Sequence, residues 1–285
     1  MKKTVLFVAA AILASSTFAQ DGLTSKKGEA YLPEAGDWAI GFDAMPFLDY
    51  ASNGNLPNAQ WVANNRPMTI VGKMFKDEST AYRAKLRIGF GSSTQEGVYD
   101  TSLTTLTGEV TDEMKMSNMM ITLGGGIEKR KGNTRLQGFY GGEALISFGG
   151  SGTEYTYADA SSGTAAAGNV HQSTQFDFGN NTAYNGNANE RVLKNTNGST
   201  FMLQLRGFIG VEYFFAPKIS MSAEYGWGLM MSSTGNGEVD TEEYTVATGA
   251  TDFSNVARKH TTGASSSFGI DTDNNGGSIT LMFHF

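Results

Sequence analysis

The stretch 201–230, FMLQLRGFIGVEYFFAPKISMSAEYGWGLM, alternates between apolar and polar residues on both sides of Ala216-Pro217. Successive side chains of a strand point to opposite faces of a sheet, so this period of two predicts one strand at about 200–215 and another at Ile219–Met230. Ala216-Pro217 turns the chain between them. One face of each strand is apolar, and the other carries glycines and the charges of Arg206, Glu212 and Glu224.

The same alternation recurs along the chain and predicts six further strands. They lie at about 37–45, 67–76, 82–90, 116–129, 135–149 and 278–285. The segment 67–76 is apolar on both faces, so its facing stays open. Long connections (46–66, 91–115, 150–199, 231–277) alternate with short ones (77–79, 130–134, 216–218). Bacterial outer-membrane barrels show this rhythm of short periplasmic turns and longer extracellular loops, with an even number of strands. The sequence therefore predicts an all-β fold, an eight-stranded antiparallel up-and-down transmembrane β-barrel over 37–285 with long extracellular loops.

The N-terminus has the layout of a secretory signal peptide. Lys2 and Lys3 precede an apolar run from Val5 to Ala14, and small residues follow up to Ala19. This run is far shorter than the roughly 20 residues that a membrane-spanning helix needs. We expect a signal peptide at 1–19, a periplasmic N-terminal segment at 20–36, and location in the outer membrane of a Gram-negative cell.

Composition narrows the function classes. The chain has no cysteine, so disulfides and cysteine-based metal or nucleophile chemistry are excluded. Without Lys2 and Lys3, 19 basic residues face 28 acidic ones, a net charge of −9. This balance argues against a nucleic-acid partner. We expect no cofactor.

The two faces of the strands favour lipid outside and charge inside. A water-soluble sandwich or lipocalin-type barrel is the alternative, but several predicted strands exceed the usual five to six residues and suit a tilted bilayer span. Aromatic residues near the strand ends match interfacial girdles. The polar face carries nearly balanced charges, and an eight-stranded barrel leaves only enough room for side chains. We expect a salt-bridge network that plugs the lumen, with an ion path as the alternative; its members are Asp43, Arg83, Lys85, Arg87, Glu128, Glu143, Arg206, Glu212 and Glu224.

Three segments resemble the outer-membrane β-barrel domain family of OmpX, OmpW and the OmpA barrel: TFAQ at 17–20, GVEYFFAPKISMSAEYGWGL at 210–229, and the terminal SITLMFHF. The likeness is one of architecture and pattern over the whole mature chain. It implies outer-membrane lipid as a partner, and it implies that Phe283 and Phe285 form the signal read by the barrel-assembly machinery. No catalytic motif comes with the resemblance, and its relatives' ligands do not transfer to the longer loops.

The loops carry little chemistry of their own. Residues 271–276 match the first half of an EF-hand calcium loop, but Met282 stands where that motif needs glutamate. His171 and His260 lie in loops and His284 in the last strand, and no spacing defines a catalytic triad. The loops at 150–199 and 231–277 scatter aromatics among Gly, Ser, Thr and Asn, a composition that suits either flexible, well-hydrated surface padding or a recognition surface. Segments such as EEYTVAT suit a ribbon that extends the barrel outward. We expect a structural or surface-interaction protein with room for an extracellular ligand at its loops, rather than a narrow porin-like channel or an enzyme.

Overall fold

A computed structural model of the chain describes residues 23–44, 70–100, 109–157, 183–185, 187–246, 253–270 and 278–285. These residues form one antiparallel sheet of 13 strands. The strands are β1 (Trp38–Asp43), β2 (Ile70–Asp77), β3 (Thr80–Asp100), β4 (Glu109–Lys131), β5 (Leu136–Thr156), β6 (Ala183–Tyr184), β7 (Asn187–Thr196), β8 (Thr200–Ala216), β9 (Ile219–Thr234), β10 (Gly237–Val246), β11 (Phe253–Thr262), β12 (Ser265–Ile270) and β13 (Ser278–His284). Within the described residues, no helix is long and apolar enough to cross a membrane.

Eight of the strands pair into a closed ring. The order β1-β2-β3-β4-β5-β8-β9-β13 returns to β1, and every neighbouring pair is antiparallel. The seam joins the first strand to the last, from Ala39 opposite His284 to Asp43 opposite Thr280. The all-β antiparallel fold is therefore confirmed, with a ring of eight strands at the predicted places.

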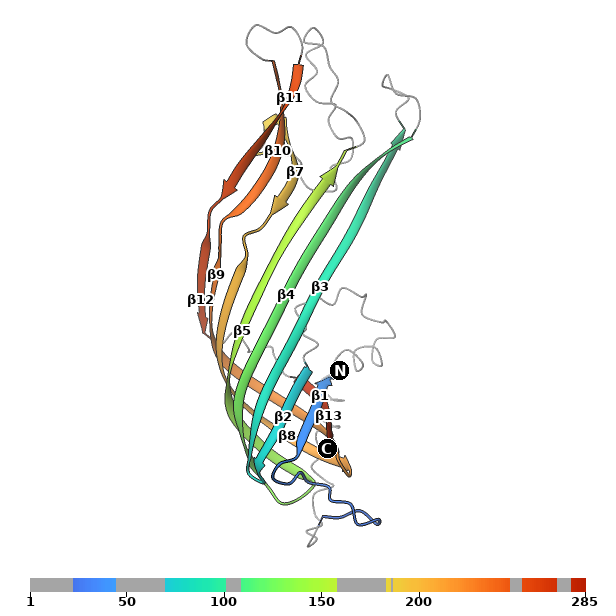
Figure 1. The fold of residues 1–285 in the computed structure, drawn as a ribbon, viewed down its shortest axis with the longest axis vertical. Helices are drawn as coiled ribbons and strands as arrows, with labels where there is room; N and C mark the ends of the chain where they lie inside the picture. Colours follow the sequence, from blue (N-terminus) through green and yellow to red (C-terminus); the bar gives the residue numbers. More distant parts are fainter. Residues whose placement is uncertain are drawn as a thin grey trace, which may run out of the picture.

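The remaining strands extend the sheet away from the short turns (Figure 1). β3 and β4 stay paired from Thr80 opposite Lys129 out to Asp100 opposite Glu109, and β7 takes over the edge of β5 near its end. β10 and β11 continue from β7, β6 pairs with β7, and β12 pairs with the outer half of β9. We call β6, β7, β10, β11 and β12 the outer sheet. Much of what the sequence predicted as loop at 91–115, 150–199 and 231–277 is thus strand.

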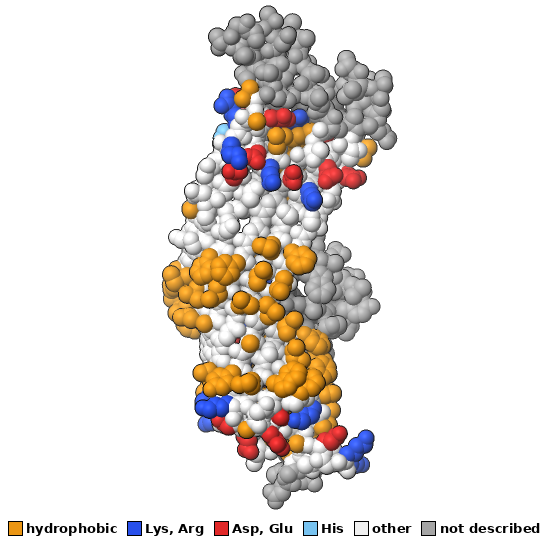
Figure 2. Space-filling view, in the orientation of Figure 1, with side chains coloured by type: hydrophobic (Ala, Val, Ile, Leu, Met, Phe, Trp, Pro, Cys, Tyr) orange, Lys and Arg blue, Asp and Glu red, His pale blue; other side chains and the backbone are white. Residues whose placement is uncertain are grey.

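Apolar side chains of the ring point outward (Figure 2). The burial pattern of β9 alternates strictly along its first half, with Met221, Ala223, Tyr225 and Trp227 exposed and Ser222, Glu224 and Gly226 between them buried. Apolar side chains form a belt in Figure 2, between bands of charged side chains above and below. This arrangement is the reverse of a water-soluble barrel, whose apolar face points inward.

The segment before β1 packs against the end of the ring that carries the short turns. Gly36 N donates to Phe75 O at 2.8 Å, and Phe75 N donates to Asp37 O at 2.8 Å. The Arg135 guanidinium stacks over the Tyr31 ring at 3.7 Å. Lys218, in the turn between β8 and β9, reaches Asp37 at 2.6 Å. This end of the ring is therefore tied to the chain that enters it.

Candidate functional site

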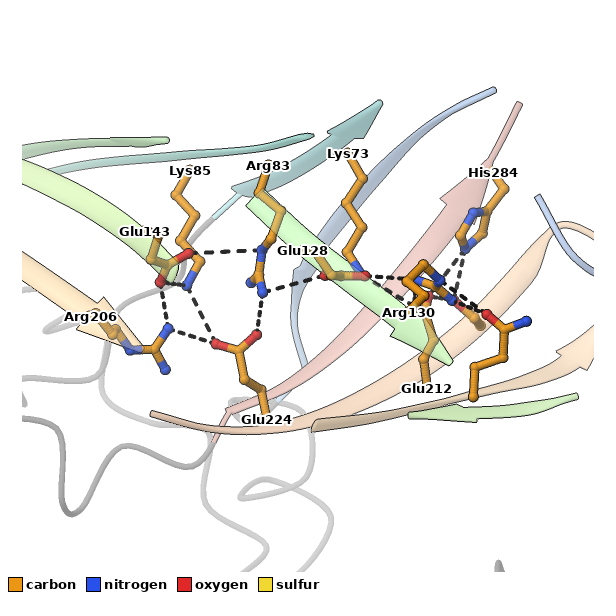
Figure 3. Close-up of polar contacts among 12 residues, drawn as sticks. Lys73, Arg83, Lys85, Glu128, Arg130, Glu143, Arg206, Glu212, Glu224 and His284 are labelled. Atoms are coloured by element: carbon orange, nitrogen blue, oxygen red, sulfur yellow. Dashed lines mark hydrogen bonds and ion pairs between the residues drawn. The ribbon is translucent and has the colours of Figure 1, made fainter. Parts of the chain in front are cut away.

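Ionised side chains fill the interior of the ring and form two connected layers (Figure 3). The layer nearer the short turns is built on Glu212. Its carboxylate accepts hydrogen bonds from Arg130 at 2.6 Å, Lys73 at 3.2 Å and the Ser220 hydroxyl at 2.5 Å. Glu128 pairs with the same two cations, at 3.0 Å to Lys73 and 2.7 Å to Arg130. These four charged side chains are at most 2% exposed, so the layer is closed to solvent.

The second layer is built on Glu143 and Glu224. Lys85 and Arg206 bind Glu143 at 2.6 and 2.5 Å. Arg83 and Arg206 bind Glu224, each at 2.7 Å. Arg83 also lies 3.4 Å from Glu128, which joins this layer to the first. Because every cation touches at least one carboxylate, the attraction between them offsets part of the large cost of removing these charges from water. We call the two layers together the interior network.

Aromatic rings separate and support the paired charges. Arg83 stacks over Phe208 with 4.0 Å between the guanidinium and the ring centroid, and Lys73 lies 4.9 Å from the centroid of Phe139. Cation–π contacts of this kind are worth more when they are desolvated. The interior network is therefore packed on apolar surfaces as well as bonded to itself.

Two glycines make room for these large side chains. A Cβ at Gly226 would overlap the guanidinium of Arg206, and one at Gly210 would overlap the ring of Phe139. The sequence pattern of glycines alternating with charges thus has a physical reason. A narrow ring holds long side chains only where the neighbouring strand leaves space for them.

The structure brings most of the predicted interior residues together, namely Arg83, Lys85, Glu128, Glu143, Arg206, Glu212 and Glu224. Arg87 faces inward in the same alternation but makes no ion pair with the described residues. The side chain of Asp43 lies outside the described residues, as do the signal segment 1–19, His171 and the calcium-like stretch 271–276.

Sequence reasoning missed Lys73, Arg130 and His284. Lys73 belongs to the segment whose facing was ambiguous, and its register opposite Ala39 and Arg83 settles that facing as inward. Arg130 was placed in a turn, but β4 runs on to Lys131 and continues the inward series of Glu128. The alternation puts His284 on the opposite face of the last strand from Phe283 and Phe285, but it does not predict that His284 joins the interior network.

His284 meets a hydroxyl and a carboxylate without forming a catalytic triad. Ser220 Oγ lies 2.8 Å from His284 Nε2, and Glu212 lies 3.4 Å from the same nitrogen. A catalytic triad needs the carboxylate on the nitrogen opposite the nucleophile. Ser220 is also fully buried. This constellation is part of the interior network rather than a reactive centre.

The two terminal phenylalanines lie along the seam of the ring. Phe285 stacks on Trp38 with 4.4 Å between ring centroids, and Phe283 lies 6.2 Å from Phe42. The backbone groups of Trp38 and Phe285 exchange two hydrogen bonds, at 2.8 and 3.2 Å. These contacts join the first and the last strand of the ring.

The outer sheet carries a second, smaller polar cluster. Glu190 accepts hydrogen bonds from the Thr241 hydroxyl at 2.5 Å and from His260, whose ring stacks on Tyr184 at 4.0 Å. Arg191 pairs with Glu242 at 2.5 Å. Burial would raise the pKa of Glu190, but these hydrogen bonds and the charges of His260 and Arg258 lower it below the usual 4.5. Glu190 binds Thr241 and His260 separately, so this cluster also lacks the order of a triad.

No family model matches the chain, and a comparison with curated proteins finds no match. The assignment of a function therefore depends on the geometry described above.

Proposed function

We propose that the protein is an integral outer-membrane β-barrel of eight strands, with a structural or surface-interaction role carried by its outer sheet and loops. The observation that carries this proposal is the inverted ring, with apolar side chains outside and paired charges inside. Only a closed ring of strands or a helix satisfies every backbone group within lipid. The belt of apolar residues between charged bands resembles the outward-facing apolar band of outer-membrane barrels.

Trp38 and Trp227 lie on this apolar wall, about half exposed. With Trp61 replaced by Phe, we expect phosphatidylcholine vesicles with brominated acyl chains to quench the fluorescence of the folded protein strongly. Folded barrel should also resist SDS and migrate differently from boiled protein on a gel. Protein that fractionates with water-soluble periplasmic material, shows no shift on boiling and is not quenched would overturn the membrane assignment.

The interior network supports a plugged lumen over a channel. We expect no stable unitary conductance in planar bilayers from the wild-type protein. The double substitution Arg83→Ala and Glu224→Ala removes a pair that crosses the lumen between β3 and β9 and gives the matched test. Steps in the wild-type protein would support the alternative, a narrow porin-like channel. Steps in the double variant alone would support the plug.

The outer sheet supplies the surface for interaction in this proposal. Its strands lie beyond the ring on the side opposite the short turns, where outer-membrane barrels carry their extracellular loops. In this proposal, outer-membrane lipid contacts the outward-facing apolar side chains of the ring. The barrel-assembly machinery is the proposed partner of Phe283 and Phe285 during biogenesis. We propose no enzymatic activity for the chain.

A further inference from the structure

Arg87 differs from the other cations inside the ring. It follows Arg83 and Lys85 at intervals of two along β3, so its side chain faces the interior, and it is partly buried there. Lys73, Arg83, Lys85, Arg130 and Arg206 each contact a carboxylate. Within the described part of the chain, Arg87 has neither an ion pair nor a hydrogen bond. A partly buried guanidinium without a counter-ion is unfavourable, because it loses water without gaining a partner.

The four carboxylates of the interior network are already occupied. Glu128, Glu143, Glu212 and Glu224 share the five cations of the network, so no excess of negative charge is left there for Arg87. The nearest of these contacts along β3 is that of Lys85 with Glu143, at 2.6 Å. Arg87 is one step further along β3 toward the outer sheet. It therefore lies at the outward boundary of the network.

Two hydroxyl groups lie on one side of Arg87, along a single cross-strand row of the sheet. Arg87 pairs in register with Thr122, and Thr122 pairs with Ser147. The hydroxyls of Thr122 and Ser147 are 2.8 Å apart. One of the two donates to the other, which leaves one hydroxyl proton of the pair for a third group. The Arg87 guanidinium and the remaining hydroxyl proton are therefore hydrogen-bond donors on neighbouring strands for which the described residues supply no acceptor.

We propose that Arg87 and the Thr122–Ser147 pair bind an oxyanion, a carboxylate or phosphate group that enters from the outer-sheet side. A planar guanidinium binds such groups through two parallel charge-assisted hydrogen bonds, and a hydroxyl adds a third donor. The group can belong to a small solute or to the headgroup of a longer molecule. Both sources share this chemistry, and separate probes distinguish them.

The test uses the full mature chain folded in phosphatidylcholine nanodiscs, with ¹⁵N NMR of the arginine Nε–H groups. We expect sodium phosphate to shift the Arg87 resonance in a saturable way, while sodium chloride at equal ionic strength does not. The resonances of Arg83 and Arg206 should stay in place because carboxylates hold those groups. Saturation by dihexanoyl phosphatidic acid at a far lower concentration than by phosphate would identify a lipid headgroup as the ligand. An equal response to both probes would identify a small solute.

Variants establish which atoms bind. Phosphate binding to the variants is measured by isothermal titration calorimetry, because a substitution of Arg87 removes its NMR signal. Arg87→Gln should abolish binding, and Thr122→Val should weaken it about tenfold, the loss expected for one hydrogen bond to a charged ligand. Arg87→Lys keeps the charge without the two-pronged geometry and should also bind more weakly, which gives a readout if Arg87→Gln fails to fold. Arg258→Gln removes an arginine of the outer sheet and should change nothing. Absence of a saturable shift, or binding as strong as in the wild type in both Arg87→Lys and Thr122→Val, would overturn the proposal.

Discussion

Glu212 is the residue on which the inner layer of the network depends. It is fully buried and binds Lys73, Arg130 and Ser220. Glu212→Gln would leave two cations with a single shared carboxylate, Glu128. Removing one partner of a buried ion pair costs about 3–5 kcal/mol, so we expect a loss of that order in the free energy of unfolding, measured by urea titration in lipid vesicles. Glu154→Gln, an exposed change on β5, should stay within about 0.5 kcal/mol of the wild type; similar losses in both would contradict this role.

Adding a single methyl group at Gly226 tests how tightly the interior of the ring is packed. A Cβ there would overlap Arg206, whereas a Cβ at Gly207, on the outer wall, would find its nearest atoms at 3.9 Å. Overpacking costs about 1–3 kcal/mol. We therefore expect Gly226→Ala to lower the free energy of unfolding by about that amount, with Gly207→Ala close to neutral. The reverse order would mean that the charged face does not fill the ring.

We expect the stability of the outer sheet to depend on pH through Glu190. The folded-state pKa of this group is lowered below 4.5, with burial opposing the shift and the bonds from Thr241 and His260 outweighing it. A group with a lowered pKa stabilises the fold above its unfolded value and loses this contribution as pH falls through the folded value. We expect hydrogen exchange of β7 and β10, corrected for intrinsic rates, to stay constant from neutral pH to about 5 and to accelerate below about 4.5.

Glu190→Gln provides the control for this pH dependence. The variant should exchange faster at neutral pH, and the acceleration between the two pH ranges should shrink. Glu154→Gln should keep the wild-type profile. An unchanged profile in Glu190→Gln would assign the acid sensitivity to other carboxylates.

Strand prediction succeeded where alternation and a tight turn occur together. The hairpin of β8 and β9 at 200–230 is the clearest case, because Ala216-Pro217 fixes both strand ends. It failed for the outer parts of β3 and β4, since QEGVYD and EVTDEM in polar surroundings show little contrast between faces. These strands form because β3 and β4 keep pairing through backbone bonds, a long-range interaction that local alternation does not report.

The residues of the interior network likewise fall into those that local alternation predicted and those that it missed. Glu143, Arg206 and Glu224 lie in strands with one clearly apolar face, so parity alone assigned them to the interior. Lys73 needed the register of β2, and Arg130 needed the true end of β4. Neither the register of β2 nor the end of β4 can be read from the local sequence. The ion pairs themselves follow from the shape of the closed ring, which sets the opposing residue for each charge.

At the scale of the whole molecule, stability of the ring depends on its seam. Phe285 stacks on Trp38, and their backbones exchange hydrogen bonds at the very end of the chain. We expect Phe285→Ala to reduce both the rate and the yield of SDS-resistant protein when urea-unfolded chains refold into vesicles. Phe268→Ala removes an exposed aromatic of β12, away from the seam, and should refold normally. Equal defects would point to general loss of apolar area instead.

We expect the seam to be the last pairing of the ring to form during folding. The hydrogen bonds that close the ring join Ala39 to His284, so nearly the whole chain forms the loop between them. Contacts this distant in sequence are slow to form, because the chain entropy is lost before the pairing compensates for it. Until β13 arrives, β1 and β9 present unpaired edges, and such edges pair readily with other chains. A cell that makes this protein must therefore keep an almost complete but open sheet from aggregating until its last seven strand residues are in place.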